Sequence, residues 1–418
     1  MWKLLRRVPG FHLRPTGSAS QPAHFSEGYP EREPMSAEAK QAVNRRVLSG
    51  MRPTGKLHIG HYVGALQNWT RLQNDYDCFF FVADWHALTT DYADTSRVKD
   101  NILEMAFDWL AAGLDPEKAT LFIQSHVPQH AELHLLLSMM TPVGWLERVP
   151  TYKDQKENLK EKDLNTYGFL GYPVLMTSDI LMYQASYVPV GEDQVAHVEI
   201  TREIARRFNQ FYWLDPQRRY PLDRATPEAQ HITVFPEPQP LLTPAAKLPG
   251  TDGRKMSKSY GNSILLSDPE AEVRKKLKTM LTDPARIRRT DPGNPDLCPV
   301  GDLHKIFSSA ETNADVRLGC TTAGIGCIQC KGWVADNIVT LLNPIQERRR
   351  KYEDNPRLAW DILEAGSARA RIAADATLLE VRESMRMSLT YPAPASAPAA
   401  GSAALPHAHA PAPAKSSE

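Results

Sequence analysis

Two histidines lie one helical turn apart in a glycine-rich segment. His58 and His61 belong to the stretch 49–66, which reads SGMRPTGKLHIGHYVGAL. Pro53 and Gly55 predict a turn, and the apolar residues at helical spacing after it predict a helix. Free backbone N–H groups at such a helix start attract phosphate, because they lie at the positive end of the helix dipole. The segment therefore predicts a phosphate site, although a purely structural helix start has the same composition.

A second segment, 253–262, reads GRKMSKSYGN and carries Lys255 and Lys258. Two lysines three residues apart among glycines and hydroxyl side chains predict a mobile cationic loop. Such a loop is suited to neutralising the negative charge that grows on a leaving pyrophosphate. Taken alone, the segment is more simply explained as a solvated basic loop.

Four of the five cysteines lie close together in the sequence. Cys298, Cys320, Cys327 and Cys330 have the spacing C-x21-C-x6-C-x2-C. Five cysteines in 418 residues are too few for a disulfide scaffold, so the cluster predicts metal ligation in a reducing compartment. Four thiolates with this spacing can hold either zinc or an iron-sulfur cluster. Four unconnected buried cysteines are the structural alternative.

Alternating strand and helix patterns indicate the elements that must position these residues. The apolar run 78–83 predicts a strand buried on both faces, and a helical pattern at 102–110 leads to a second apolar run at 119–123. Strand, helix and strand in this order imply a right-handed crossover and a parallel sheet, and therefore an α/β fold. Beyond Leu265 the pattern changes to charged amphipathic helices, which predicts a second, mostly helical domain.

The composition excludes a uniformly basic nucleic-acid binder and a protein with membrane-spanning helices, and the two chain ends differ from the middle. With 49 basic and 49 acidic residues the net charge is zero, so a nucleic-acid partner would need a local basic patch. No apolar run reaches the roughly 18 to 20 residues of a membrane-spanning helix. Residues 1–44 are predicted to be a disordered or targeting-like extension, with Met1 or Met35 as the start, and residues 389–418 a disordered Ala/Pro-rich tail.

Two further segments complete a family pattern. Residues 171–183 read GYPVLMTSDILMY, and residues 188–194 read VPVGEDQ. Together with the histidine segment and the lysine loop, in this order, they make residues 47–388 resemble the bacterial-type tryptophanyl-tRNA synthetases of class I. The four cysteines resemble those of the subgroup that carries a [4Fe-4S] cluster. The resemblance implies a Rossmann-like catalytic domain at 45–264 and a helical tRNA-binding domain with the cluster site at 265–388.

The resemblance also implies a tryptophan site with Asp179 as the acceptor for the indole N–H. Indole offers one donor and no acceptor, so a carboxylate at the floor of the pocket identifies it. Asp179 alone would otherwise be explained as a carboxylate at a helix N-terminus, and His86 as a structural residue after a strand. The other residues implied for tryptophan binding are Gly50, Tyr172, Met176, Val188, Val190 and Gln194.

An ATP site follows from the same resemblance. Lys255, Lys258, His58 and His61 are implied as catalytic through positioning and charge neutralisation, with Mg²⁺ held mainly by the phosphates. This family usually has Thr and Asn at the two histidine positions, which leaves the individual hydrogen bonds open. The remaining residues implied for ATP are Arg52, Pro53, Thr54, Gly60, Gly191, Glu192, Asp193, Leu248, Met256, Ser257 and Ser259.

The implied reaction joins L-tryptophan to tRNA(Trp) through tryptophanyl-adenylate. The resemblance implies a homodimer in the cytoplasm, or in the mitochondrial matrix if the basic N-terminal segment is a transit peptide. Arg286, Arg288, Arg289 and the run 348–351 are the candidate tRNA contacts, with a solvated helix face as the alternative. A tyrosine-specific enzyme, or a paralogue that binds RNA or a metal cluster without activating an amino acid, are the competing hypotheses.

Overall fold

The computed structural model describes residues 45–153, 164–214, 232–242 and 248–387 of the 418-residue chain. The segments predicted as an N-terminal extension, 1–44, and as a tail, 389–418, lie outside the described residues.

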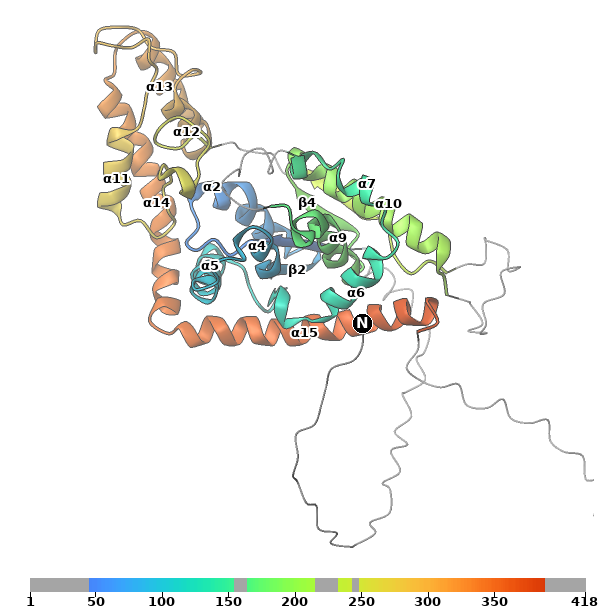
Figure 1. The fold of residues 1–418 in the computed structure, drawn as a ribbon. Coiled ribbons are helices and arrows are strands. Elements are labelled where there is room, and N and C mark those ends of the chain that lie inside the picture. Colours follow the sequence, from blue (N-terminus) through green and yellow to red (C-terminus); the bar gives the residue numbers. More distant parts are fainter. Residues whose placement is uncertain (1–44, 154–163, 215–231, 243–247, 388–418) are drawn as a thin grey trace, which may run out of the picture.

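A five-stranded parallel sheet forms the centre of the molecule (Figure 1), as the sequence pattern predicted. The strand order is β3-β2-β1-β4-β5, so β2 and β3 lie on one side of β1, and β4 and β5 lie on its other side. In such sheets the crevice for a ligand lies where the order reverses, at the carboxyl ends of the strands. Here that position lies between β1 and β4. The strands are β1 (Arg46–Met51), β2 (Asp77–Val82), β3 (Ala119–Ile123), β4 (Tyr187–Val190) and β5 (Gln239–Leu242).

Alternate side chains of the strands enter two separate cores, one on each face of the sheet. In β2, Phe80 packs with Trp69 and Trp109 in one core, whereas Phe79 and Phe81 belong to the other. This division explains why the predicted strand is continuously apolar. The helices around the sheet are α2 (Ile59–His61), α3 (Gln67–Leu72), α4 (Asp84–Asp91), α5 (Val98–Ala112), α6 (Gln129–Ser138), α7 (Val143–Leu146), α9 (Tyr167–Met182) and α10 (Val195–Phe211). Short helical turns are η1 (Tyr62–Leu66), η2 (Gln124–His126), η3 (Glu192–Gln194) and η5 (Lys258–Tyr260).

The C-terminal part is helical, as predicted, and consists of an arm and one long helix (Figure 1). Four helices form an arm that projects from the sheet, and the last helix runs back along the sheet, where it packs against β3 and α6. A Cβ at Gly366 of this last helix would lie 1.8 Å from the carbonyl oxygen of Leu121, so glycine permits the close approach. The arm helices are α11 (Glu270–Thr279), α12 (Pro299–Phe307), α13 (Ala310–Thr321) and α14 (Cys327–Glu353), and the last helix is α15 (Pro356–Ser384).

None of the helices within the described ranges is both long enough and apolar enough to cross a lipid bilayer.

Candidate active site

A cavity of about 380 Å³ opens at the carboxyl ends of β1 and β4, at the reversal of strand order. Its volume lies within the range of small-molecule sites. All eight residues predicted for tryptophan binding line this one cavity, although they come from four separate stretches of the sequence. They are Gly50, His86, Tyr172, Met176, Asp179, Val188, Val190 and Gln194.

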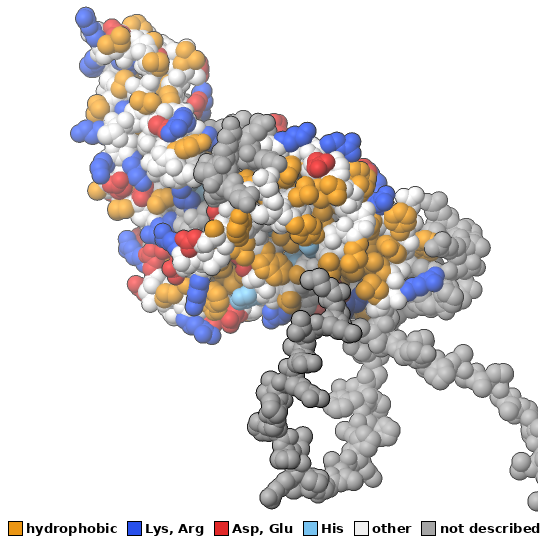
Figure 2. All heavy atoms as spheres, viewed as in Figure 1, with side chains coloured by type: hydrophobic (Ala, Val, Ile, Leu, Met, Phe, Trp, Pro, Cys, Tyr) orange, Lys and Arg blue, Asp and Glu red, His pale blue; other side chains and the backbone are white. Residues whose placement is uncertain are grey.

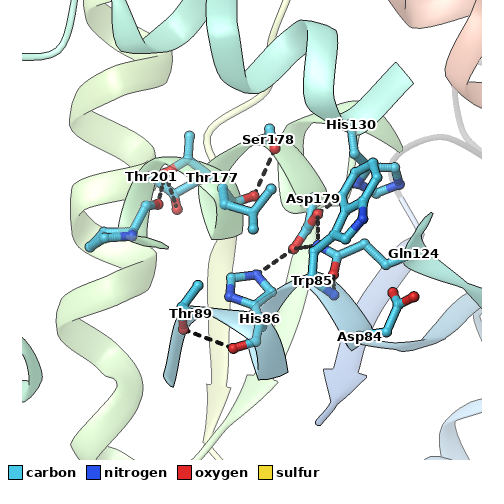
Figure 3. A network of polar contacts seen from close by, with 12 residues as sticks. Asp84, Trp85, His86, Thr89, Gln124, His130, Thr177, Ser178, Asp179 and Thr201 are labelled. Atoms are coloured by element: carbon cyan, nitrogen blue, oxygen red, sulfur yellow. Dashed lines mark hydrogen bonds and ion pairs between the residues drawn. The ribbon is translucent and has the colours of Figure 1, made fainter. Parts of the chain in front are cut away.

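Asp179 is a buried residue of the cavity lining and accepts hydrogen bonds from three side chains (Figure 3). His86 Nε2 lies 2.8 Å from Oδ2, His130 Nδ1 lies 2.6 Å from Oδ1, and Gln124 Nε2 lies 2.8 and 2.9 Å from the two oxygens. Burial alone would raise the pKa of Asp179, but the hydrogen bonds from His130 and His86 outweigh it, and the pKa lies below its ordinary value. The cavity lining therefore includes a buried, ionised carboxylate.

The glycine at position 50 serves the protein's own packing. A Cβ at Gly50 would lie 2.4 Å from Cζ of Phe81, so the missing side chain makes room for that phenylalanine. Gly50 nevertheless lines the cavity, as expected of a residue implied for tryptophan binding. Tyr172, implied for tryptophan binding, has its hydroxyl 2.7 Å from the Thr151 hydroxyl and 3.0 Å from His197 Nε2.

The two histidines of the first motif cap the N-terminus of α2, with His58 directly before this helix and His61 as its third residue. His58 Nδ1 accepts from the backbone N–H of Gly60 at 3.1 Å, and His61 Nδ1 accepts from the backbone N–H of His58 at 3.2 Å. Burial, with contributions from Lys258 and Lys255, lowers the pKa of His58 to about 4. Burial and the neighbouring His58 lower the pKa of His61 to about 3. Both imidazoles are therefore neutral at pH 7 and carry their hydrogen on Nε2, which leaves one N–H donor on each ring.

The second motif lies directly against the first, although about 200 residues separate them in the sequence. Lys258 Nζ donates to the carbonyl oxygens of Thr54 at 2.5 Å and Lys56 at 2.8 Å. Burial lowers the pKa of Lys258 to about 8. Asn262 organises the loop, because its Oδ1 accepts from Ser257 N–H at 2.8 Å. The predicted cationic loop thus has one lysine docked on the turn before the helix.

The other residues predicted for ATP surround this junction. Arg52 follows β1 and contacts Asp91 and Thr90 of α4. Pro53 and Thr54 line a second cavity beside α4 and α5. Leu248 and Met256 are buried and joined by a backbone hydrogen bond of 2.9 Å. Gly191 lines the first cavity and Glu192 is exposed beyond β4, whereas the Asp193 side chain lies outside what the structure describes.

Asp108 and Arg349 support the same turn from behind. Asp108, which is 0% exposed, accepts from the backbone N–H of Leu57 at 2.6 Å and from Arg349 Nε at 2.7 Å. Arg349 comes from α14, so the helical arm is tied to the residue that precedes His58.

The four clustered cysteines line one small cavity in the arm. Cys298 precedes α12, Cys320 lies in α13, and Cys327 and Cys330 occupy the first turn of α14. Burial raises the pKa of Cys330 to about 12, and the other three thiols add to it. Within the described ranges, no set of three or more His, Cys, Asp or Glu side chains converges so that it could hold a single metal ion.

Residues 40–343 match the model of a protein family described as tRNA synthetases class I (W and Y). The chain belongs to this family. It is 52% identical over 397 residues to the tryptophan–tRNA ligase of Ralstonia nicotianae, covering 83% of this chain and 99% of the relative. It is also 52% identical over 344 residues to the tryptophan–tRNA ligase of Thermotoga maritima, covering 82% and 99%. A crystal structure of tryptophanyl-tRNA synthetase from Campylobacter jejuni, complexed with ADP and tryptophan, superposes with a TM-score of 0.70 at 31% identity, covering 82% of this chain and 99% of the other.

Two of the arginines expected to contact tRNA in this class I synthetase are buried, and that part of the expectation is wrong. Arg286 is 9% exposed and donates to the carbonyl oxygens of Arg289 and Ile325 at 3.0 and 2.5 Å. Arg349 is 1% exposed and pairs with Asp108. A run of basic residues in a sequence suggests a solvated helix face. Here one arginine of each run is buried instead, because it binds carbonyl or carboxylate acceptors inside the protein. Arg288, Arg289, Arg348, Arg350 and Lys351 are exposed.

Sequence reasoning missed Gln124 and His130, both of which bind Asp179 in this synthetase. Gln124 directly follows β3, and its position at the carboxyl end of a parallel strand is a signal that could have identified it. His130 lies in the first turn of α6, and only the packing of α6 on α9 brings it to Asp179.

Proposed function

We propose that the chain is a tryptophan–tRNA ligase, which activates L-tryptophan with ATP to tryptophanyl-adenylate and pyrophosphate and then transfers tryptophan to the 3′ end of tRNA(Trp). The observation that carries this proposal is the buried, ionised Asp179 in a cavity that all eight predicted residues line. The names of the relatives from Ralstonia nicotianae and Thermotoga maritima support it.

Asp179 would select indole by its single N–H. A carboxylate only accepts hydrogen bonds, and the indole ring only donates one. A phenylalanine in the same place would leave the buried carboxylate without that donor, which is a large penalty in a site designed for hydrogen bonding. Met176, Val188 and Val190 supply apolar walls for the ring, while Tyr172 and Gln194 are proposed for the amino-acid end.

The tryptophan carboxylate would attack the α-phosphorus of ATP, and no side-chain nucleophile is needed. We propose that the phosphates lie at the helix start that His58 and His61 cap, where the Nε2–H donors are available. Lys258 and Lys255 would neutralise charge on the departing pyrophosphate. Mg²⁺ would arrive with the nucleotide and be held mainly by phosphates and water. The remaining proposed ATP contacts are Arg52, Pro53, Thr54, Gly60, Gly191, Glu192, Asp193, Leu248, Met256, Ser257 and Ser259.

The four cysteines are proposed to hold a [4Fe-4S] cluster. Zinc, bound by the sulfurs at about 2.3 Å from one centre, is the alternative. A cluster spans a larger volume with one thiolate at each iron, and all four thiols line one cavity. Arg286, 3.9 Å from the sulfur of Cys320, and the buried Lys331 would offset its negative charge.

Anaerobic purification with an absorption spectrum and with iron and sulfide analysis tests the cluster. A brown protein with about four irons and four sulfides per chain is expected. A colourless protein with one zinc and no sulfide would contradict the cluster, and metal-free reactive thiols would contradict ligation altogether.

We propose that residues 45–264 form the catalytic domain and residues 265–388 the tRNA-binding domain of a cytoplasmic homodimer. An exposed apolar surface supports the dimer. Its members are each more than half exposed: Leu135 on α6, Met139 directly after α6, Val143 on α7 and Tyr167 on α9. Figure 2 shows hydrophobic side chains gathered over the region of these helices. Sedimentation of the wild-type chain tests the assembly, with a mass of two chains expected.

ATP–pyrophosphate exchange, run separately with tryptophan and with tyrosine, tests the proposed reaction. Exchange with tryptophan alone is expected. Exchange that depends on tyrosine would favour the tyrosine-specific branch, and no exchange with either amino acid would favour a paralogue without activating chemistry.

A further inference from the structure

The Asp179 carboxylate has two kinds of partner (Figure 3). His86 lines the cavity, so its hydrogen bond to Oδ2 lies on the side that a ligand reaches. Gln124 and His130 are 0% exposed and hold the carboxylate from the protein side. A ligand donor can therefore exchange with His86, whereas the other two donors stay in place.

His130 is itself held by a second hydrogen bond. Its Nε2 lies 2.7 Å from the hydroxyl of Tyr183, which is 0% exposed. Burial, reinforced by the charge of Asp179, raises the pKa of Tyr183 well above its ordinary value, so the hydroxyl keeps its hydrogen. That hydroxyl donates to Nε2, and the imidazole then carries its hydrogen on Nδ1 and donates to Asp179. The chain of donors runs from Tyr183 through His130 to Oδ1.

The surroundings of His130 are apolar. The rings of Phe81, Phe122 and Tyr183 lie with their centroids 6.4, 6.2 and 5.4 Å from its own. A hydrogen bond to an ionised group in such surroundings is stronger than one exposed to water. Gln124 is fixed in a similar way, because its Oε1 accepts from the backbone N–H of Trp85 at 3.2 Å and its amide N–H groups must then face Asp179.

We infer that His130, oriented by Tyr183, is a positioning residue for tryptophan specificity: it fixes the charge and orientation of the Asp179 carboxylate that accepts the indole N–H. This inference rests on the proposed function and extends it to residues that do not touch the amino acid. Without His130, the carboxylate loses its shortest hydrogen bond and can turn or take up a proton. The selectivity for an N–H donor then falls.

The test compares tryptophan with β-benzothienylalanine, in which a sulfur atom replaces the indole N–H and the ring shape is kept. kcat/KM for pyrophosphate exchange is measured with both amino acids for the wild type, His130→Leu and His130→Asn. We expect His130→Leu to lower kcat/KM for tryptophan by about 10- to 100-fold and to change kcat/KM for the analogue and KM for ATP little. His130→Asn should retain most of the preference, because its side-chain amide can donate from the place of Nδ1.

A matched control is Leu137→Ala, two turns farther along α6 and also 0% exposed. It destabilises the same helix without touching Asp179, so it should lower the midpoint of unfolding and leave the preference for tryptophan unchanged. Where His130→Leu does not fold, Tyr183→Phe decides: it removes one buried oxygen atom and should lower the preference by about threefold.

The possible results separate the two proposals. The inference about His130 is overturned, and the proposed function is not, if the folded His130→Leu variant keeps the wild-type preference for tryptophan. Where His130→Leu does not fold, the same result in Tyr183→Phe overturns it. A wild-type chain that does not activate tryptophan overturns the proposed function and this inference with it.

Discussion

Replacing Arg349 by methionine should strongly destabilise the protein, because it removes the only cation within hydrogen-bonding distance of Asp108 in the part of the chain that the structure describes. Asp108 is 0% exposed and lies 2.7 Å from Arg349 Nε, while its second oxygen accepts from the backbone of Leu57 at 2.6 Å. Arg349 is 1% exposed and also bonds Glu104 and Glu353. The variant leaves a buried carboxylate with one backbone donor and no opposite charge.

The magnitude follows from this geometry. Removing one partner of a buried ion pair costs about 3 to 5 kcal/mol, because the remaining charge has already lost its hydration. Exposed pairs such as Arg357 with Asp361 should cost no more than about 1 kcal/mol. Arg357→Met on α15 is therefore the matched control, since it removes the same side chain from a solvated pair.

Urea unfolding at pH 7 measures both losses, and KM for ATP in the folded Arg349→Met protein reports on the turn before His58. The double variant Asp108→Asn with Arg349→Met should recover part of the stability, because the amide oxygen still accepts from Leu57 without a buried charge. A loss below about 1 kcal/mol in Arg349→Met, equal to that in Arg357→Met, would refute this account of the pair.

Three further predictions follow from the site. Because the pKa of Lys258 is about 8, kcat/KM for ATP in pyrophosphate exchange should fall above pH 8 in the free enzyme. Lys258→Arg should move this fall to higher pH. An identical pH profile in both proteins would contradict a role for the charge of Lys258. His58 and His61 have folded-state pKa values of about 4 and about 3, below the ordinary 6.5. Between pH 6.5 and these folded-state values the unfolded chain binds more protons than the folded protein. The free energy of unfolding should therefore decrease as the pH falls from about 6.5 toward 4. Urea titrations at several pH values check this, and His61→Asn should flatten the dependence. Replacing the exposed Arg288 and Arg289 by glutamate should weaken tRNA charging and its salt dependence while pyrophosphate exchange stays intact; unchanged charging would mean that tRNA docks elsewhere.

Much of the fold could be predicted because its signals are local. The run 78–83 is apolar at every position, and this pattern indicates a strand that is covered on both faces, as Phe79 and Phe80 are in the two cores. The eight residues for tryptophan were named from the family resemblance. The sheet brings them together because they lie in β1 and β4 or on helical segments packed at the same edge.

The partners of charged groups could not be predicted, because topology decides them. His130 is 49 residues from Asp179 in the sequence, and Arg349 is 241 residues from Asp108. No periodicity connects such pairs, and a buried arginine in a run of basic residues has the same local sequence as a solvated one. The reciprocal capping by His58 and His61 was also not foreseen, since it depends on the backbone angles at a helix start rather than on residue spacing.

The most direct test of the central claim is pyrophosphate exchange with the wild type and Asp179→Asn, each with tryptophan and with tyrosine. The wild type should exchange with tryptophan and not with tyrosine. Asp179→Asn should lower kcat/KM for tryptophan by about 10- to 150-fold, the loss of a hydrogen bond to a charged group, with KM for ATP nearly unchanged. Undiminished tryptophan activation in Asp179→Asn, or a wild-type chain that activates tyrosine instead, would contradict the central claim.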